Sequence, residues 1–192
     1  MTPDFFATGL AELSAAAATA QALGPDLVRV AGRYQRTLSG GGKIFFAGNG
    51  GSAADAEHIA TEFVVRLRDN REALAAQALV ASGALMTAAG NDLGFENIYA
   101  RQLQAWAKPG DLLVLHSTSG ASPNLLAAAR TATRLGVGVV AFLGAKGGEL
   151  EALAELVIRA PSENPSHIQE LHIAMEHLLV AAVEQLLRGE SR

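Results

Sequence analysis

The chain has 192 residues, of which 49% are hydrophobic, and it carries a formal net charge of −4. This length suits one well-buried domain and leaves little room for a second. The negative charge argues against direct nucleic-acid binding, because proteins that bind the phosphate backbone usually present a basic face. The absence of cysteine excludes disulfides and thiolate metal sites.

Neither a signal peptide nor a membrane span is expected. The first residues, MTPDFFATGLAEL, lack a basic segment followed by a long apolar core. Residues 73–90 are uncharged and just long enough to suggest a membrane span, but they are mostly Ala, Ser, Gly and Gln. We therefore expect a buried strand followed by a short helix in this segment.

Two helices are expected to lead the chain. Residues 4–23 are rich in alanine, which favours helix. Gly24-Pro25 separates this segment from a second helix over 25–39, where Pro25 suits the first helical turn. We find no internal repeat, low-complexity tract or linker.

Five short apolar runs follow, each bounded by Gly, Asp or Ser. Continuous apolar runs are typical of strands that are buried on both faces. Strands are expected at 43–48, 77–82, 111–117, 138–144 and 155–160, and helices at 52–68, 83–105, 122–135, 147–153 and 165–188. This alternation predicts an α/β fold with a five-stranded, mainly parallel sheet flanked by helices on both sides. Such sheets bind ligands beyond the carboxyl ends of their strands.

A glycine turn, Gly48-Asn49-Gly50-Gly51-Ser52, follows the first predicted strand. Glycines allow a sharp turn and a close approach to backbone N–H groups, and the helix N-terminus that follows favours an anion. The turn also matches G-x-G-x-x-A, but Ala81-Ser82-Gly83 stands where a dinucleotide site needs an acidic residue. Taken alone, the segment is equally consistent with a plain strand-to-helix turn.

A serine loop follows the third predicted strand. Ser117, Thr118 and Ser119 offer three consecutive hydroxyls, and Ser122 is placed to cap a helix that begins at Pro123. Hydroxyls and free N–H groups can hold a phosphate monoester without lysine. An ordinary polar loop is the alternative, but two such turns at the ends of adjacent strands favour a small phosphorylated ligand between them.

Acid–base groups occur on two further segments. His58 and Glu62 are four residues apart on one predicted helix and therefore share a face. Asn91 and Asp92 follow Gly90, where we expect a break between helices. A histidine and glutamate at this spacing are usually just a surface pair, so the pattern alone does not establish a site.

The last predicted helix offers several candidates. Gln169 and His177 lie about 80° apart around the helix axis. Glu176 is a better geometric neighbour of Gln169, and His172 is a further candidate. The residues by themselves predict a phosphosugar site with acid–base or metal-binding groups, and leave this choice open.

Four segments together resemble the sedoheptulose-7-phosphate isomerases, or phosphoheptose isomerases, of the sugar-isomerase (SIS) domain family. They are AGNGGSAADAEHIATEF, GNDLGFENIYARQ, STSGASPNLLAA and IQELHIAMEHLL, in the family's order and spacing. The resemblance covers nearly the whole chain. It implies one SIS domain over 1–192, a flavodoxin-like or Rossmann-like sandwich. Residues 1–40 would be a helical pair used in oligomer packing, and 41–192 would be the α/β core and C-terminal helix.

The resemblance also implies an activity. It implies a cytoplasmic homotetramer, with sites at subunit interfaces, that interconverts D-sedoheptulose 7-phosphate and D-glycero-D-manno-heptose 7-phosphate through an enediol. This would be the first step towards nucleotide-activated heptose for lipopolysaccharide or other surface glycans. No nucleic-acid or membrane partner is expected.

Site residues follow from the same resemblance. Family members bind one zinc per subunit, and the implied ligands are His58, Glu62, Gln169 and His177, which selects His177 over its neighbours on the last helix. We expect Glu62 to act as the catalytic base and His177 as its acid–base partner. The implied substrate contacts are Asn49, Gly50, Gly51, Ser52, Glu62, Asn91, Asp92, Ser117, Thr118, Ser119, Ser122 and Gln169.

Two features depart from the family, and two other functions compete. Ser166-His167 stand where the family commonly has Arg just before IQE, and REALAAQALVAS lacks the usual prolines before the second strand. One alternative is a non-catalytic SIS adaptor that regulates replication initiation, which the complete acid–base set argues against. The other is an isomerase of a different sugar phosphate.

Overall fold

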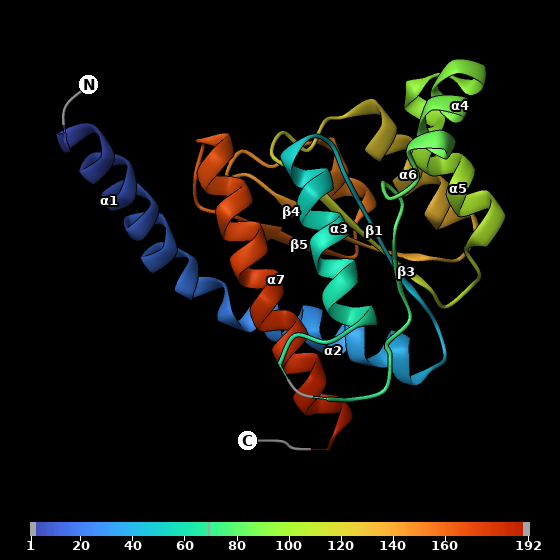
Figure 1. Ribbon diagram of the computed structural model, residues 1–192, viewed down its shortest axis with the longest axis horizontal. Helices are drawn as coiled ribbons and strands as arrows, with labels where there is room; N and C mark the ends of the chain where they lie inside the picture. The colour runs from blue at the N-terminus through green and yellow to red at the C-terminus, as the bar shows by residue number, and fades with distance from the viewer. Residues whose placement is uncertain (1–2, 69, 190–192) are drawn as a thin grey trace.

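A computed structural model describes residues 3–68 and 70–189 of the chain. Two helices lead it as expected: α1 (Pro3–Ala20) and α2 (Gly24–Ser39), joined by the 3₁₀ turn η1 (Gln21–Leu23). Pro25 lies in the first turn of α2. Figure 1 shows α1 pointing away from the body of the molecule. Consistent with this, Ala20 is the one buried residue among the described residues 3–20.

The five expected strands form one sheet in the order β2-β1-β3-β4-β5, and every neighbouring pair is parallel. Their bounds are β1 (Ile44–Gly48), β2 (Ala76–Ala78), β3 (Leu112–Ser117), β4 (Gly138–Leu143) and β5 (Leu156–Arg159). The strand that was expected over 77–82 is observed as β2, which is much shorter. It is an edge strand that pairs with β1 alone, and the chain then leaves the sheet so that Ser82 can cap the next helix by accepting a bond from Leu85 N at 3.3 Å.

Five more α-helices connect or follow the strands: α3 (Gly51–Val64), α4 (Gly83–Leu93), α5 (Ile98–Trp106), α6 (Pro123–Arg134) and α7 (Pro165–Leu187). The helical segment expected over 83–105 is interrupted at Gly94, which adopts φ 84° and is followed by the 3₁₀ turn η2 (Phe95–Asn97). The helix expected over 147–153 is the 3₁₀ turn η3 (Glu149–Leu153).

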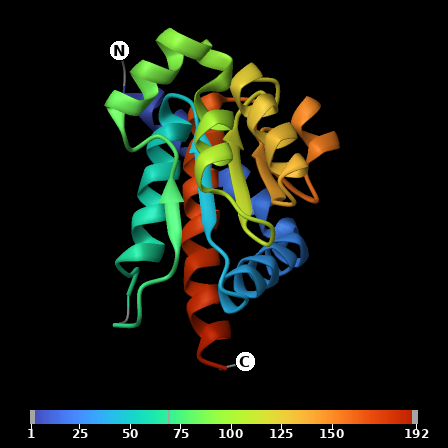
Figure 2. The same cartoon turned by 90° about the vertical axis from the view of Figure 1, so that its right-hand side faces the viewer.

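Alternate side chains of the strands fill two separate cores, as the period of a strand requires. Phe46 and Val114 pack with the helices on one face, α2, α3 and α7, whereas Phe45 and Leu113 pack with α5 and α6 on the other. Figure 2 shows the two helical layers on opposite sides of the sheet. Both faces are therefore covered, which explains why β1 and β4 are apolar along their length and β3 is apolar up to Leu115.

The topology places two loops side by side. In the β1–β3 ladder Gly48 pairs with His116, so the glycine turn and the serine loop leave the same edge of the sheet. Strand order reverses here, because β2 and β3 flank β1, and such switch points are where open α/β sheets bind ligands. Among the described residues, no helix is long and apolar enough to cross a membrane.

Candidate active site

The glycine turn leads directly into α3 and approaches α7 closely. Gly50 has φ 57°, in the left-handed region that favours glycine. A Cβ on Gly51 would lie 2.4 Å from Oε1 of Gln169, so a larger residue would displace that side chain. Ser52 is buried, and its Oγ accepts a bond from Gln169 Nε2 at 3.5 Å. Gln169 of α7 therefore lies over the first turn of α3.

The serine loop keeps several hydroxyl protons available. Ser117 Oγ accepts a bond from Gly120 N at 3.0 Å, and Ser119 Oγ accepts one from Ala121 N at 3.3 Å. A hydroxyl that accepts in this way still has its O–H to donate. Ser122 occupies the N-cap position of α6 as predicted, but its side chain makes no capping bond, which corrects the expected role of its hydroxyl.

Three polar side chains meet between α3 and α7, which run side by side in Figure 1. Nε2 of His58 lies 3.0 Å from Nε2 of His177 and 3.4 Å from Oε1 of Glu62. One ligand atom from each of the three residues lies within 4.8 Å of the others. A hollow of about 460 Å³ opens beside His58 and Glu62. Groups 119 residues apart in sequence are thus close enough to act on one small molecule.

This cluster fits a metal ion. Two ligands of a tetrahedral zinc, each bonded at about 2.0–2.1 Å, lie roughly 3.3 Å apart. The distances of 3.0 and 3.4 Å from His58 are close to that separation. Two imidazoles and a carboxylate are also a donor set that zinc accepts.

The other candidates on α7 point into the core. Glu176 is fully buried; its Oε1 accepts a bond from the Tyr34 hydroxyl at 3.1 Å and lies 3.1 Å from Nε2 of His116. His172 is also fully buried and donates from Nε2 to the Leu143 carbonyl at 3.1 Å. Burial and the neighbouring His116 lower the pKa of His172 to about 3. His177 is therefore the α7 histidine that faces α3.

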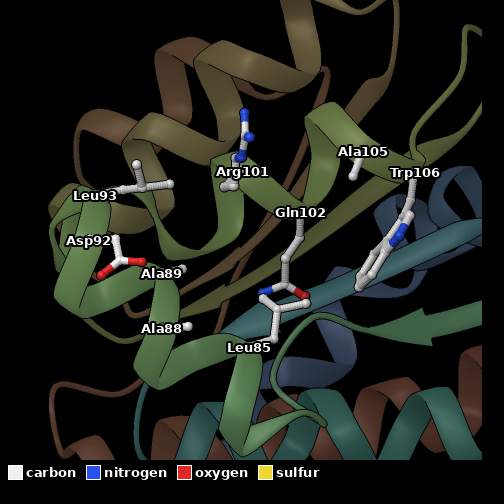
Figure 3. A pocket seen from close by; sticks show the side chains of 9 residues that line it. All are labelled: Leu85, Ala88, Ala89, Asp92, Leu93, Arg101, Gln102, Ala105 and Trp106. Carbon is white, nitrogen blue, oxygen red and sulfur yellow. The ribbon is translucent and has the colours of Figure 1, made fainter.

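Asn91 and Asp92 lie apart from this cluster, in the last turns of α4. The expected break comes after them, at Gly94, so both side chains sit on a helix. They are exposed, and Asn91 Nδ2 donates to Asp92 Oδ1 at 2.7 Å. Asp92 lines a different hollow, of about 360 Å³, between α4 and α5, together with Trp106 and other residues (Figure 3).

Three further residues near the site were not anticipated. Asn124 bonds Asn49 from the start of α6. Asp55 lies one turn before His58; burial raises the pKa of its carboxyl, an effect opposed by the imidazoles of His116 and His58. Arg71 donates to the carbonyls that end α3 and to Glu184 of α7. The spacing of Asp55 from His58 was a usable signal, whereas the other two depend on contacts between distant segments.

Ser166-His167, the segment that differs from the family pattern, lies next to α1. His167 Nδ1 is 2.8 Å from Oε2 of Glu170, and its Nε2 is 3.7 Å from Oε2 of Glu12 on α1. The bond with Glu170 is the main reason why the pKa of His167 is raised. His167 therefore faces the leading helix rather than the His58 cluster.

Comparison with known proteins identifies the family of this chain and several of its relatives. A family model described as the SIS domain matches residues 8–144, more than half of the chain. The chain belongs to the SIS-domain family. A phosphoheptose isomerase from Akkermansia muciniphila is 47% identical over 164 residues, which cover 85% of this chain and 87% of that protein. One from Roseiflexus sp. is 44% identical over 172 residues, covering 90% and 87%.

A solved structure shows the same fold. The phosphoheptose isomerase from Francisella tularensis superposes with a TM-score of 0.93 at 33% identity, covering 96% of this chain and 100% of that one. The family, the five-stranded parallel sheet and the leading helices were therefore correctly predicted. The roles of individual site residues stay proposals.

Proposed function

We propose that this SIS-domain chain is a phosphoheptose isomerase, which interconverts D-sedoheptulose 7-phosphate and D-glycero-D-manno-heptose 7-phosphate. The observation that carries the proposal is the meeting of His58, Glu62 and His177 within 4.8 Å, in a chain whose relatives bear that name. The product would enter the synthesis of nucleotide-activated heptose for lipopolysaccharide or other surface glycans.

The phosphate end of the substrate would be held by the two turns. Backbone N–H groups of the glycine turn, Asn49 to Ser52, stand at the N-terminus of α3, where an anion is favoured. The hydroxyls of Ser117, Thr118, Ser119 and Ser122 supply further donors. Binding at this end would hold the reacting carbons in place beside α3 and α7.

Proton transfer would occur at the other end. In the open-chain ketose, Glu62 removes a proton from C1, the C1–C2 double bond forms, and the C2 oxygen gains a proton to give the enediol. The O1 proton then leaves, C1 becomes the aldehyde, and Glu62 returns a proton to C2. His177, beside Glu62, would move the proton between the two oxygens. Isomerisation involves no net oxidation, so these proton transfers account for every bond that changes.

Zinc is the metal we propose, one per subunit, held by His58, Glu62 and His177 with Gln169 as the fourth ligand. When bound, it would act as a Lewis acid towards the C1 and C2 oxygens. Glu62 would then be both a ligand and a base. The spacing of the three nitrogen and oxygen donors supports this assignment.

We also propose a cytoplasmic homotetramer in which residues 1–40 pack between subunits and the sites lie at subunit interfaces. The exposed side chains of α1 support this assembly. Asn91 and Asp92, exposed on α4, would serve as substrate contacts at such an interface. This would explain why they lie apart from the remaining site residues in one chain.

The activity can be tested by NMR in D₂O with a panel of ketose phosphates. Sedoheptulose 7-phosphate should be converted to the aldose with deuterium at C2, because Glu62 exchanges its proton with solvent during the enediol stage. Removing the metal with a chelator should abolish conversion, and adding zinc should restore it.

Three results would contradict parts of the proposal. Full activity after verified metal removal would refute the zinc assignment. Conversion of a pentose or hexose phosphate in preference to the heptose would refute the substrate. No conversion of any sugar, together with capture of a replication initiator, would favour the adaptor function.

A further inference from the structure

Two asparagines join the glycine turn to the serine loop. Asn49 follows β1, and Asn124 is the second residue of α6. Asn49 Nδ2 donates to Asn124 Oδ1 at 2.9 Å, and Asn124 Nδ2 donates to Asn49 Oδ1 at 2.8 Å. Asn124 is only 1% exposed, so water does not compete for these bonds. They are side-chain contacts between residues 75 positions apart.

The orientation of both amides is fixed. Asn124 Oδ1 also accepts a bond from Leu125 N at 3.0 Å, and an N–H group in that place would face another donor. Asn124 therefore cannot flip, and Asn49 cannot flip without opposing oxygen to oxygen. Of the Asn49 amide, one N–H remains free of this pair and can donate to a ligand.

The ladder of β1 and β3 sets the spacing of the two turns only up to Gly48 and His116. Beyond the sheet, the Asn49–Asn124 pair bonds the glycine turn to the first turn of α6, which directly follows the serine loop. We propose that Asn124 is a positioning residue: it holds the Asn49 amide and sets the distance between the glycine turn and the serine loop. The inference rests on the proposed isomerase function.

Replacing Asn124 with aspartate makes this role visible in a pH profile. At pH 8 one carboxylate oxygen can still accept from Asn49 Nδ2 and Leu125 N, but the other faces Asn49 Oδ1. This repulsion raises the pKa of the new carboxyl. As the pH falls, the protonated carboxyl can donate to Asn49 Oδ1 and restore the lost bond.

The experiment compares kcat/KM for sedoheptulose 7-phosphate between pH 5 and 8, each value divided by that of the wild type. Asn124→Asp should lose at least about tenfold at pH 8 and regain most of this loss towards pH 5. Asn124→Ala should show a loss that does not vary with pH. Asn70→Asp, which adds the same charge at an exposed position, should match the wild type throughout.

A second readout separates this inference from the proposed function. The thermal shift that inorganic phosphate produces should follow the same pH pattern in Asn124→Asp, whether or not the sugar is converted. The positioning role would be overturned if the ratio of Asn124→Asp to wild type did not change with pH in either readout. It would also be overturned if Asn124→Ala had the same kcat/KM as the wild type at every pH. If the wild type fails to convert the heptose but the phosphate shift follows the pattern, only the isomerase function is lost.

Discussion

His172 should make the fold sensitive to acid. Its imidazole is fully buried, and burial lowers its pKa from 6.5 to about 3. Between these two values the unfolded chain binds a proton that the folded chain does not, so stability falls as the pH falls. The loss attributable to this group approaches about 1.4 kcal/mol for each pH unit below 6.5.

Denaturant unfolding at pH 7 and pH 4.5 can measure this effect. The wild type should lose more stability over this interval than His172→Gln, whose amide can still donate to the Leu143 carbonyl. His167→Gln is the control: the pKa of His167 is raised, so its own contribution has the opposite sign. Equal acid-side losses in the wild type and His172→Gln would contradict the assignment.

The sequence could select some site residues and not others. The spacing of His58 and Glu62 shows that they share a helical face, and this spacing is a local property. The choice among His172, Glu176 and His177 depends on how α7 is rotated against the sheet. That rotation is set by packing in the core, which a helical wheel does not contain, and only the family resemblance selected His177.

At the scale of helices, one buried ion pair holds α3 against α7. Arg71 Nε lies 2.7 Å from Glu184 Oε1, and the two side chains are 11% and 4% exposed. The same guanidinium donates to the carbonyls of Phe63 and Glu62 at 2.9 and 2.7 Å. Arg71 therefore closes the C-terminal end of α3 and joins it to α7, the two helices that carry His58, Glu62 and His177.

Removing one partner of this pair should destabilise the protein strongly. Arg71→Met leaves Glu184 buried without its cation and should lower the free energy of unfolding by roughly 3–5 kcal/mol. Glu184→Leu in addition should recover part of the loss, because the unpaired charge is then gone. Lys146→Met is the matched control; its pair with Glu163 is 77% and 66% exposed and should contribute less than about 1 kcal/mol.

Denaturant titrations of these variants would measure how much the Arg71–Glu184 pair contributes to stability. A loss for Arg71→Met no larger than that for Lys146→Met would show that the pair does not hold the helices together. So would a double variant that is markedly less stable than Arg71→Met alone.

Element boundaries show which signals are local. The central strands were predicted within a residue because they are continuous apolar runs bounded by turns. The edge strand β2 was not, since its end depends on pairing with β1 and on the cap at Ser82. A break between helices was expected at Gly90 but lies at Gly94, because a single glycine such as Gly90 is tolerated inside a helix.

At the scale of the whole molecule, α1 should serve assembly. Phe6 and Leu10 are 61% and 69% exposed on a helix that points away from the body. Light scattering should give the wild type a mass four times the 19.9 kDa of one chain. Phe6→Asp with Leu10→Asp should yield smaller particles, whereas Thr8→Asp, about 160° around the helix from Leu10, should not. A monomeric wild type would refute the tetramer.

The central claim is that Glu62 of α3 and His177 of α7 act jointly on one phosphorylated sugar, and a double-mutant cycle in kcat/KM tests it most directly. Glu62→Gln and His177→Asn should each lower the value for sedoheptulose 7-phosphate by at least about two orders of magnitude. Residues that act as a unit give non-additive losses, so the double variant should be little worse than the poorer single variant. Losses that multiply, or near-normal turnover in either single variant, would contradict the account.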